Sequence, residues 1–190
     1  FMPIHPIGEF NKKGELGCPY SISDYRAVNP EYGTMEDFKE LVSAIHEKGM
    51  KCMIDVVYNH TSHESVLSKE HPEFFYKKPD GRFGNKVGDW TDVIDLDYTN
   101  KDLWDYQLET LKMWAKIVDG FRCDVASLVP IEFWNRARKE VAEVNPDCLW
   151  LAESVEYGLI KYARDTGFNC LSDSELYQAF DILYDYDVYP

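Results

Sequence analysis

Long apolar runs are missing from this sequence of 190 residues. No stretch approaches the roughly 18 apolar residues that a membrane-spanning helix needs. Basic residues are scarce, with 20 Lys and Arg against 34 Asp and Glu, so the formal charge is −14. Because such a chain is repelled by phosphates and by anionic lipid surfaces, we expect neither nucleic acid nor a membrane as a partner.

An even number of cysteines and an initiator methionine are also missing. The five cysteines cannot all pair with one another, and we expect Cys52 and Cys123 to be buried apolar thiols. Unpaired cysteines favour a reducing compartment such as the cytoplasm. The chain begins without an initiator methionine or a signal sequence, and we expect it to be a piece of a longer protein. The missing signal peptide is then uninformative about export.

Three short apolar segments each carry polar side chains near their carboxyl ends. The segments are 51–60, 120–127 and 149–154, and the polar side chains are Asp55, Asn59, His60, Arg122, Asp124 and Glu153. Short β-branched segments that alternate with helical patterns predict the parallel strands of an α/β fold. The carboxyl ends of such strands form the active site of a (β/α)8 barrel.

Arg122 and Asp124 are two residues apart on one predicted strand, so their side chains share a face. An unpaired buried charge is costly, and we therefore expect the two to pair. A guanidinium beside a carboxylate lowers the carboxyl pKa, which would keep Asp124 ionised. For this strand alone a structural ion pair is the simpler interpretation, but the other two strands favour an active site.

The three segments, in this order, resemble the signatures of the α-amylase family of retaining glycoside hydrolases. Residues 55–60 (Asp-Val-Val-Tyr-Asn-His) match its first signature, residues 120–124 its second and residues 152–153 its third. The resemblance implies a partial (β/α)8 TIM barrel with a small irregular insertion after one strand. It also implies hydrolysis of α-glucosidic bonds in starch-like glucans or oligosaccharides, by double displacement through a glycosyl-enzyme intermediate.

Retention of configuration needs one ionised and one protonated carboxyl group, roughly 5–5.5 Å apart. The resemblance assigns Asp124 as the nucleophile and Glu153 as the acid and base. The residues next to Glu153 in the sequence are apolar or uncharged. We therefore expect Glu153 to have no cation beside it and to keep its proton to higher pH. Arg122 is expected to contact substrate, and Asp55 to support its neighbours.

Two further residues are implied to bind substrate. Tyr20 has the place of the loop tyrosine that stacks on the sugar in this family, although Pro19 stands where the family more often has glycine. His60 is expected to donate to a sugar hydroxyl. Asn59 corresponds to a calcium-binding position in many members, but calcium takes 6–8 oxygens and one carboxamide is a weak candidate. The residues themselves predict no metal site, so calcium is the one cofactor left open.

The chain divides into three expected parts. Residues 1–60 hold a strand, a loop, a helix and a strand of the barrel; 61–98, with several Pro and Gly, form a small inserted subdomain; and 99–190 continue the barrel but stop before its last strands. We expect capping boxes at Thr34 and Ser172, and a strand at 168–171. A partial barrel has two open strand edges, which favour pairing with another copy.

Departures from the family pattern keep other functions open. The fourth signature, a His–Asp pair, is absent, so we expect the fragment alone to be inactive. Ser127 and Leu128 stand where many amylases have Lys and His, and Val125 occurs in relatives that cut α-1,6 bonds. One alternative is a transglycosylase, in which an acceptor sugar replaces water. Another is a catalytically silent carbohydrate-binding or scaffold barrel, which the presence of Asp124 and Glu153 disfavours.

Overall fold

The main sheet of the protein has four parallel strands, as a computed structural model that describes residues 1–87 and 90–185 shows. Their order is β1-β4-β5-β6, with bounds β1 Met53–Val56, β4 Gly120–Cys123, β5 Leu149–Ala152 and β6 Ile182–Leu183. The register pairs Asp55 with Arg122 and Arg122 with Leu151. Because these strands are parallel and in register, the residues that follow them meet at one edge of the sheet. The α/β class is confirmed.

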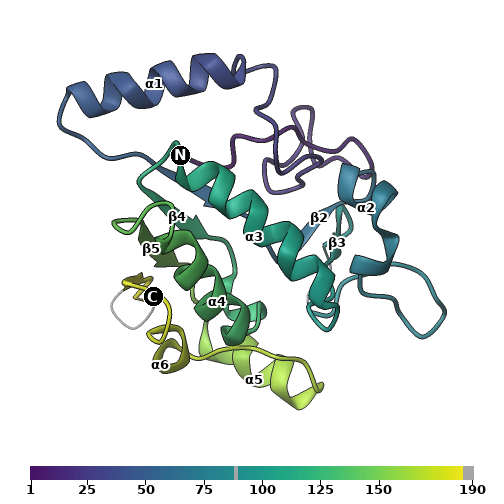
Figure 1. The fold of residues 1–190 in the computed structure, drawn as a ribbon. Helices are drawn as coiled ribbons and strands as arrows, with labels where there is room; N and C mark the ends of the chain where they lie inside the picture. Colours follow the sequence, from purple (N-terminus) through teal and green to yellow (C-terminus); the bar gives the residue numbers. More distant parts are fainter. Residues whose placement is uncertain (88–89, 186–190) are drawn as a thin grey trace.

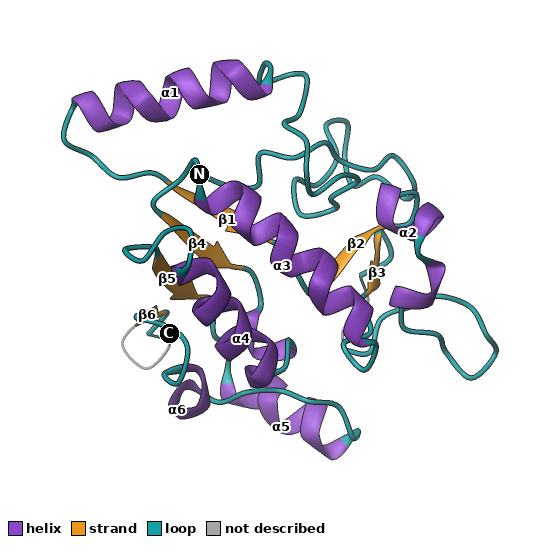
Figure 2. Cartoon of the chain, in the orientation of Figure 1, coloured by secondary structure: helices purple, strands orange, loops and turns teal. Residues whose placement is uncertain are grey.

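Helices alternate with the strands and cover the sheet (Figures 1 and 2). They are α1 Met35–Glu47, α3 Lys101–Ala115, α4 Ile131–Ala142, α5 Tyr157–Asp165 and α6 Asp173–Leu176. Helices α3 and α4 lie side by side. Buried aromatic rings fill the core, and the ring centroids of Trp134 and Trp150 are 6.4 Å apart. Within the described residues, no helix has both the length and the apolar character that crossing a membrane requires.

An excursion separates β1 from α3. It contains β2 His60–Ser62, α2 Val66–Glu70, a short 3-10 helix Pro72–Phe74 and β3 Val93–Asp95. Strands β2 and β3 form their own antiparallel pair, apart from the main sheet (Figure 2). Their register sets His60 opposite Asp95, so the beginning and the end of the excursion lie together beside the carboxyl end of β1.

Local sequence signals predicted the helix starts correctly. Thr34 and Asp37 form a capping box at α1, and Ser172 and Glu175 form another at α6. The strand expected at 168–171 is wrong. This segment is irregular and buries Cys170 and Leu171 against the core, with the Leu171 N–H donating to the Ser127 carbonyl at 2.7 Å. The strand comes after α6 instead, as β6.

Candidate active site

The end of β4 turns sharply beside β5. Val125, directly after Asp124, has a left-handed backbone with φ +36° and ψ +46°, which is rare for a β-branched residue. In this conformation the Val125 N–H donates to Glu153 Oε2 at 2.8 Å. The next N–H, of Ala126, donates to the Glu153 backbone carbonyl at 3.0 Å. The turn therefore ties the ends of β4 and β5 together.

Arg122 is the centre of the site. Its Nη1 donates to both carboxylate oxygens of Asp55, at 2.9 and 2.8 Å, and to Asp124 Oδ1 at 2.8 Å. Its Nη2 lies 3.0 Å from Glu153 Oε1. The expected contact between Arg122 and Asp124 is present. The same guanidinium also reaches Asp55, which lies on β1, and Glu153, which directly follows β5.

The expectation that Glu153 has no cation beside it is wrong. The carboxylate has two donors, the Arg122 guanidinium and the Val125 N–H. Sequence neighbours are a poor guide here, because Arg122 belongs to the adjacent strand and reaches Glu153 across the sheet.

Three carboxyl groups share one guanidinium, and this imbalance sets their titration. Burial, followed by the charges of Glu153 and Asp55, raises the pKa of Asp124 to about 8 against the effect of Arg122. Burial also raises the pKa of Asp55, again against Arg122. The expected lowering of the Asp124 pKa is therefore wrong. Asp124 therefore holds its proton near neutral pH in the empty site.

A cavity of about 220 Å³ opens at the ends of β4 and β5. It brings together four of the predicted site residues, Tyr20, His60, Asp124 and Glu153. Arg122 and Asp55 line a second cavity that shares Tyr20, whose hydroxyl donates to Asp55 Oδ2 at 3.1 Å. Burial lowers the pKa of His60 to about 4, so its imidazole is neutral at pH 7 and has one N–H to donate.

Sequence reasoning missed the contribution of the excursion to this cavity. Trp90 lines it with its ring centroid 5.4 Å from that of His60. Asp92 lines it too, buried and paired with Lys13 Nζ at 2.8 Å. The only local signal was a tryptophan in a segment without helical or strand periodicity. An aromatic residue on a loop, outside the regular strands and helices, is often part of a binding site.

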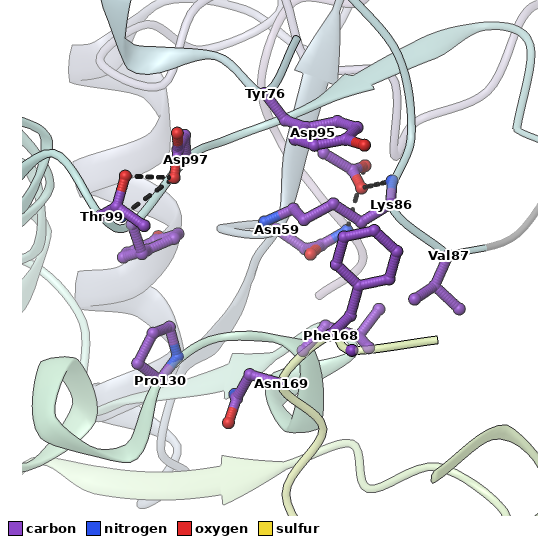
Figure 3. Close-up of a pocket in the computed structure, with 13 residues that line it drawn as sticks. Asn59, Tyr76, Lys86, Val87, Asp95, Asp97, Thr99, Pro130, Phe168 and Asn169 are labelled. Atoms are coloured by element: carbon purple, nitrogen blue, oxygen red, sulfur yellow. Dashed lines mark hydrogen bonds between the residues drawn. The ribbon is translucent and has the colours of Figure 1, made fainter. Parts of the chain in front are cut away.

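The surroundings of Asn59 do not fit a calcium ion. Asn59 lies outside the catalytic cavity, where its Nδ2 contacts His60 Nδ1 at 3.1 Å and Asp95 Oδ1 at 3.4 Å. Within residues 1–87 and 90–185, no group of three or more His, Cys, Asp or Glu side chains is arranged to hold a metal ion. The side chain of Lys86 enters the same cluster (Figure 3), and an ammonium group repels a divalent cation.

Several solved structures similar to this chain are α-amylases. The chain matches the α-amylase from Lactobacillus plantarum with a TM-score of 0.96 and 61% identity, over 98% of this chain and 44% of that one. A noncanonic maltogenic α-amylase from Thermotoga neapolitana matches with a TM-score of 0.83 and 42% identity, over 99% and 40%. The α-amylase from Geobacillus thermoleovorans, solved in complex with acarbose, matches with a TM-score of 0.73 and 28% identity, over 98% of this chain and 41% of that one. The sheet is therefore part of an amylase-type TIM barrel.

Curated relatives carry two kinds of name. An α-1,4-glucan:maltose-1-phosphate maltosyltransferase from Rhodospirillum rubrum is 33% identical over 80% of this chain. Alpha-amylase 3 from Dictyoglomus thermophilum is 30% identical over 86%. The chain spans only 25% and 37% of their lengths. The family model for the α-amylase catalytic domain matches residues 10–165. The chain thus belongs to the α-amylase family and contains part of its catalytic domain.

Proposed function

We propose that the protein containing this chain is a retaining glycoside hydrolase of α-glucosidic bonds in starch-like glucans or oligosaccharides. The observation that carries the proposal is the pair of carboxyls, Asp124 and Glu153, on neighbouring strands of one cavity and held by one arginine. The raised pKa of Asp124 keeps a proton in the site near neutral pH, and acid-assisted displacement requires one. The acarbose complex of a similar amylase supports a glucan-like substrate.

In the first step Asp124 attacks the anomeric carbon as a carboxylate, and Glu153 donates its proton to the departing glycosidic oxygen. The product is a glycosyl ester of Asp124. In the second step Glu153 removes a proton from water, the hydroxide attacks the same carbon, and Asp124 leaves as a carboxylate. This sequence requires the proton of the pair to lie on Glu153 once substrate is bound, because only an ionised Asp124 is a nucleophile.

The remaining residues would position the sugar. Tyr20 offers a ring face at the cavity wall, and its hydroxyl is fixed by Asp55. A neutral His60 presents an N–H to a sugar hydroxyl. Arg122 holds Asp55, Asp124 and Glu153 in one geometry. The excursion supplies Trp90 to the same cavity, which supports dividing the chain into barrel parts 1–60 and 99–190 and an inserted subdomain 61–98.

A transglycosylase is the second candidate. The maltosyltransferase relatives favour it, one of them being 33% identical over 80% of this chain. The chemistry differs only in the acceptor, because a sugar hydroxyl in place of water would attack the glycosyl ester of Asp124. A silent binding barrel is a weaker proposal, because both carboxyl groups are present.

The test is product analysis with the full-length protein, on maltooligosaccharides and on isomaltose. We expect release of reducing sugar with retained α-configuration, and a loss of at least about 10³-fold in kcat for Asp124→Asn and Glu153→Gln. Longer oligosaccharides instead of free sugar would identify the transglycosylase. Unchanged turnover in either variant would exclude the proposed chemistry.

Azide distinguishes the two roles. In Glu153→Ala azide should attack the glycosyl ester from the face opposite Asp124 and yield an α-glycosyl azide. In Asp124→Ala azide replaces the missing nucleophile and yields a β-glycosyl azide. The opposite outcome for the two variants would reverse the assignment of nucleophile and acid.

A further inference from the structure

Lys86 reaches into a closed polar cluster next to, but outside, the catalytic cavity. Its Nζ donates to the Leu96 carbonyl at 2.7 Å, and its backbone N–H donates to Asp95 Oδ2 at 2.6 Å. Figure 3 shows the extended Lys86 side chain pointing into a cavity of about 390 Å³, whose wall includes Asn59, Asp95 and Asp97. Both ends of this lysine are thus engaged by the residues of β3 and just after it.

Asp95 is the buried carboxyl of the cluster, with only 1% of its surface exposed, and burial raises its pKa against the donors around it. Besides the Lys86 N–H, its carboxylate accepts from Asn59 Nδ2 at 3.4 Å and from Asn85 Nδ2 at 3.2 Å. Neutral amides satisfy its hydrogen bonds but do not balance its charge. A buried carboxylate is costly without a cation nearby.

The ammonium group of Lys86 lies in the same cavity as Asp95 and Asp97 and interacts with both carboxylates at a longer range than an ion-pair contact. Burial lowers the pKa of Lys86, whereas the charges of Asp95 and Asp97 raise it, so these two carboxylates favour the charged lysine. Lys86 Nζ also donates a hydrogen bond to the Leu96 carbonyl oxygen, and backbone carbonyl oxygens are among the ligands of calcium.

We propose that the Lys86 ammonium is the resident cation of the Asn59–Asp95–Asp97 cluster, in place of a divalent metal ion. The excursion is then fastened to the end of β1 without bound calcium. Asn59 is the link, because its carbonyl accepts from the Leu96 N–H at 2.9 Å and its amide contacts His60. The inference does not rest on the proposed reaction, and its readouts are metal content and melting temperature.

The first experiment uses the unmodified full-length protein. After dialysis against EDTA and then against chelator-free buffer, we expect an unchanged melting temperature, with no rise on adding millimolar CaCl2. We also expect no stoichiometric calcium in the protein as purified, by plasma mass spectrometry. Calcium that copurifies at about one ion per chain and whose removal lowers the melting temperature would overturn the proposal, because a ligand that binds the native state stabilises it.

The second experiment removes the charge. Lys86→Met keeps most of the apolar stem but leaves Asp95 without its cation, so the melting temperature should fall by several °C, at roughly 2–4 °C per kcal/mol. Lys78→Met is the matched control, an exposed lysine of the same excursion, and should change little. A Lys86→Met protein as stable as this control would contradict the proposal. Lys86→Ala removes the side chain from the cavity beside Asn59, Asp95 and Asp97. We expect CaCl2 to raise the melting temperature of this variant but not that of the wild type.

Discussion

Two clusters of carboxylates lie on either side of the β1 end and differ in their balance of charge. At the catalytic cavity Asp55, Asp124 and Glu153 share one cation, Arg122. In the other cluster Lys86 faces Asp95 and Asp97, and amides complete the hydrogen bonds of Asp95. The first cluster includes Glu153, whose side chain is 21% exposed, whereas Asp95 is 1% exposed.

The difference separates chemistry from support. Where carboxylates outnumber the cation in a cavity, one of them retains a proton at neutral pH and becomes available for acid–base catalysis. Where amide and backbone donors saturate the carboxylate, as at Asp95, the cluster holds two segments together. Three carboxyls around one guanidinium in a cavity thus mark the reactive cluster, and the following experiments test that distinction.

The largest effect is expected from Arg122→Met. Removing the one guanidinium leaves three carboxyls without their cation, and we expect a loss of roughly 3–5 kcal/mol in the free energy of unfolding. Arg136 is the control, since it also pairs with two carboxylates but is 41% exposed. Arg136→Met should cost about 0–1 kcal/mol. Urea unfolding measures both, and equal losses would remove the distinction between the buried cluster and a surface pair.

A smaller effect, opposite in sign, is expected from Asp124→Asn. The pKa of Asp124 in the folded protein is raised to about 8 from 3.8, so its contribution to stability is complete below about pH 4 and is lost as the pH rises through about 8. The uncharged variant does not suffer this loss. Its melting temperature should exceed that of the wild type by a few °C at pH 9, and the difference should shrink toward pH 4.

Asp105→Asn is the control for this pH dependence, because Asp105 is 63% exposed and pairs with Arg136 at the surface. We expect no growing difference from the wild type between pH 4 and pH 9. A wild type that is as stable as Asp124→Asn at pH 9 would mean that the excess negative charge costs nothing in the folded protein.

The smallest effect is expected from Tyr20→Phe. The variant loses one hydrogen bond, to Asp55, and should lose about 1–2 kcal/mol of stability. The ring remains, so KM for maltooligosaccharides should stay within about threefold, whereas Tyr20→Ala should raise it about tenfold through lost stacking. Calorimetry and steady-state kinetics measure the two effects. A larger KM for Tyr20→Phe than for Tyr20→Ala would assign the hydroxyl, not the ring, to substrate binding.

Much of the fold followed from local patterns. The capping boxes at Thr34 and Ser172 predicted two helix starts, because a cap depends on residues only three apart. Strands β1, β4 and β5 were predicted from apolar runs. The run 168–171 misled, since periodicity does not say whether an apolar segment pairs with a sheet or packs on a core.

The sequence by itself determined which side chains stand at the ends of β1, β4 and β5, because strand position and side-chain parity are local properties. Only the tertiary structure decided their electrostatics. Arg122 reaches Glu153 and Asp55 across neighbouring strands, and burial beside two other carboxyls raises the pKa of Asp124. Lys86, likewise, meets Asp95 only once the excursion has folded. Charge balance is a sum over spatial neighbours, and those neighbours are set by the packing of segments distant in the sequence.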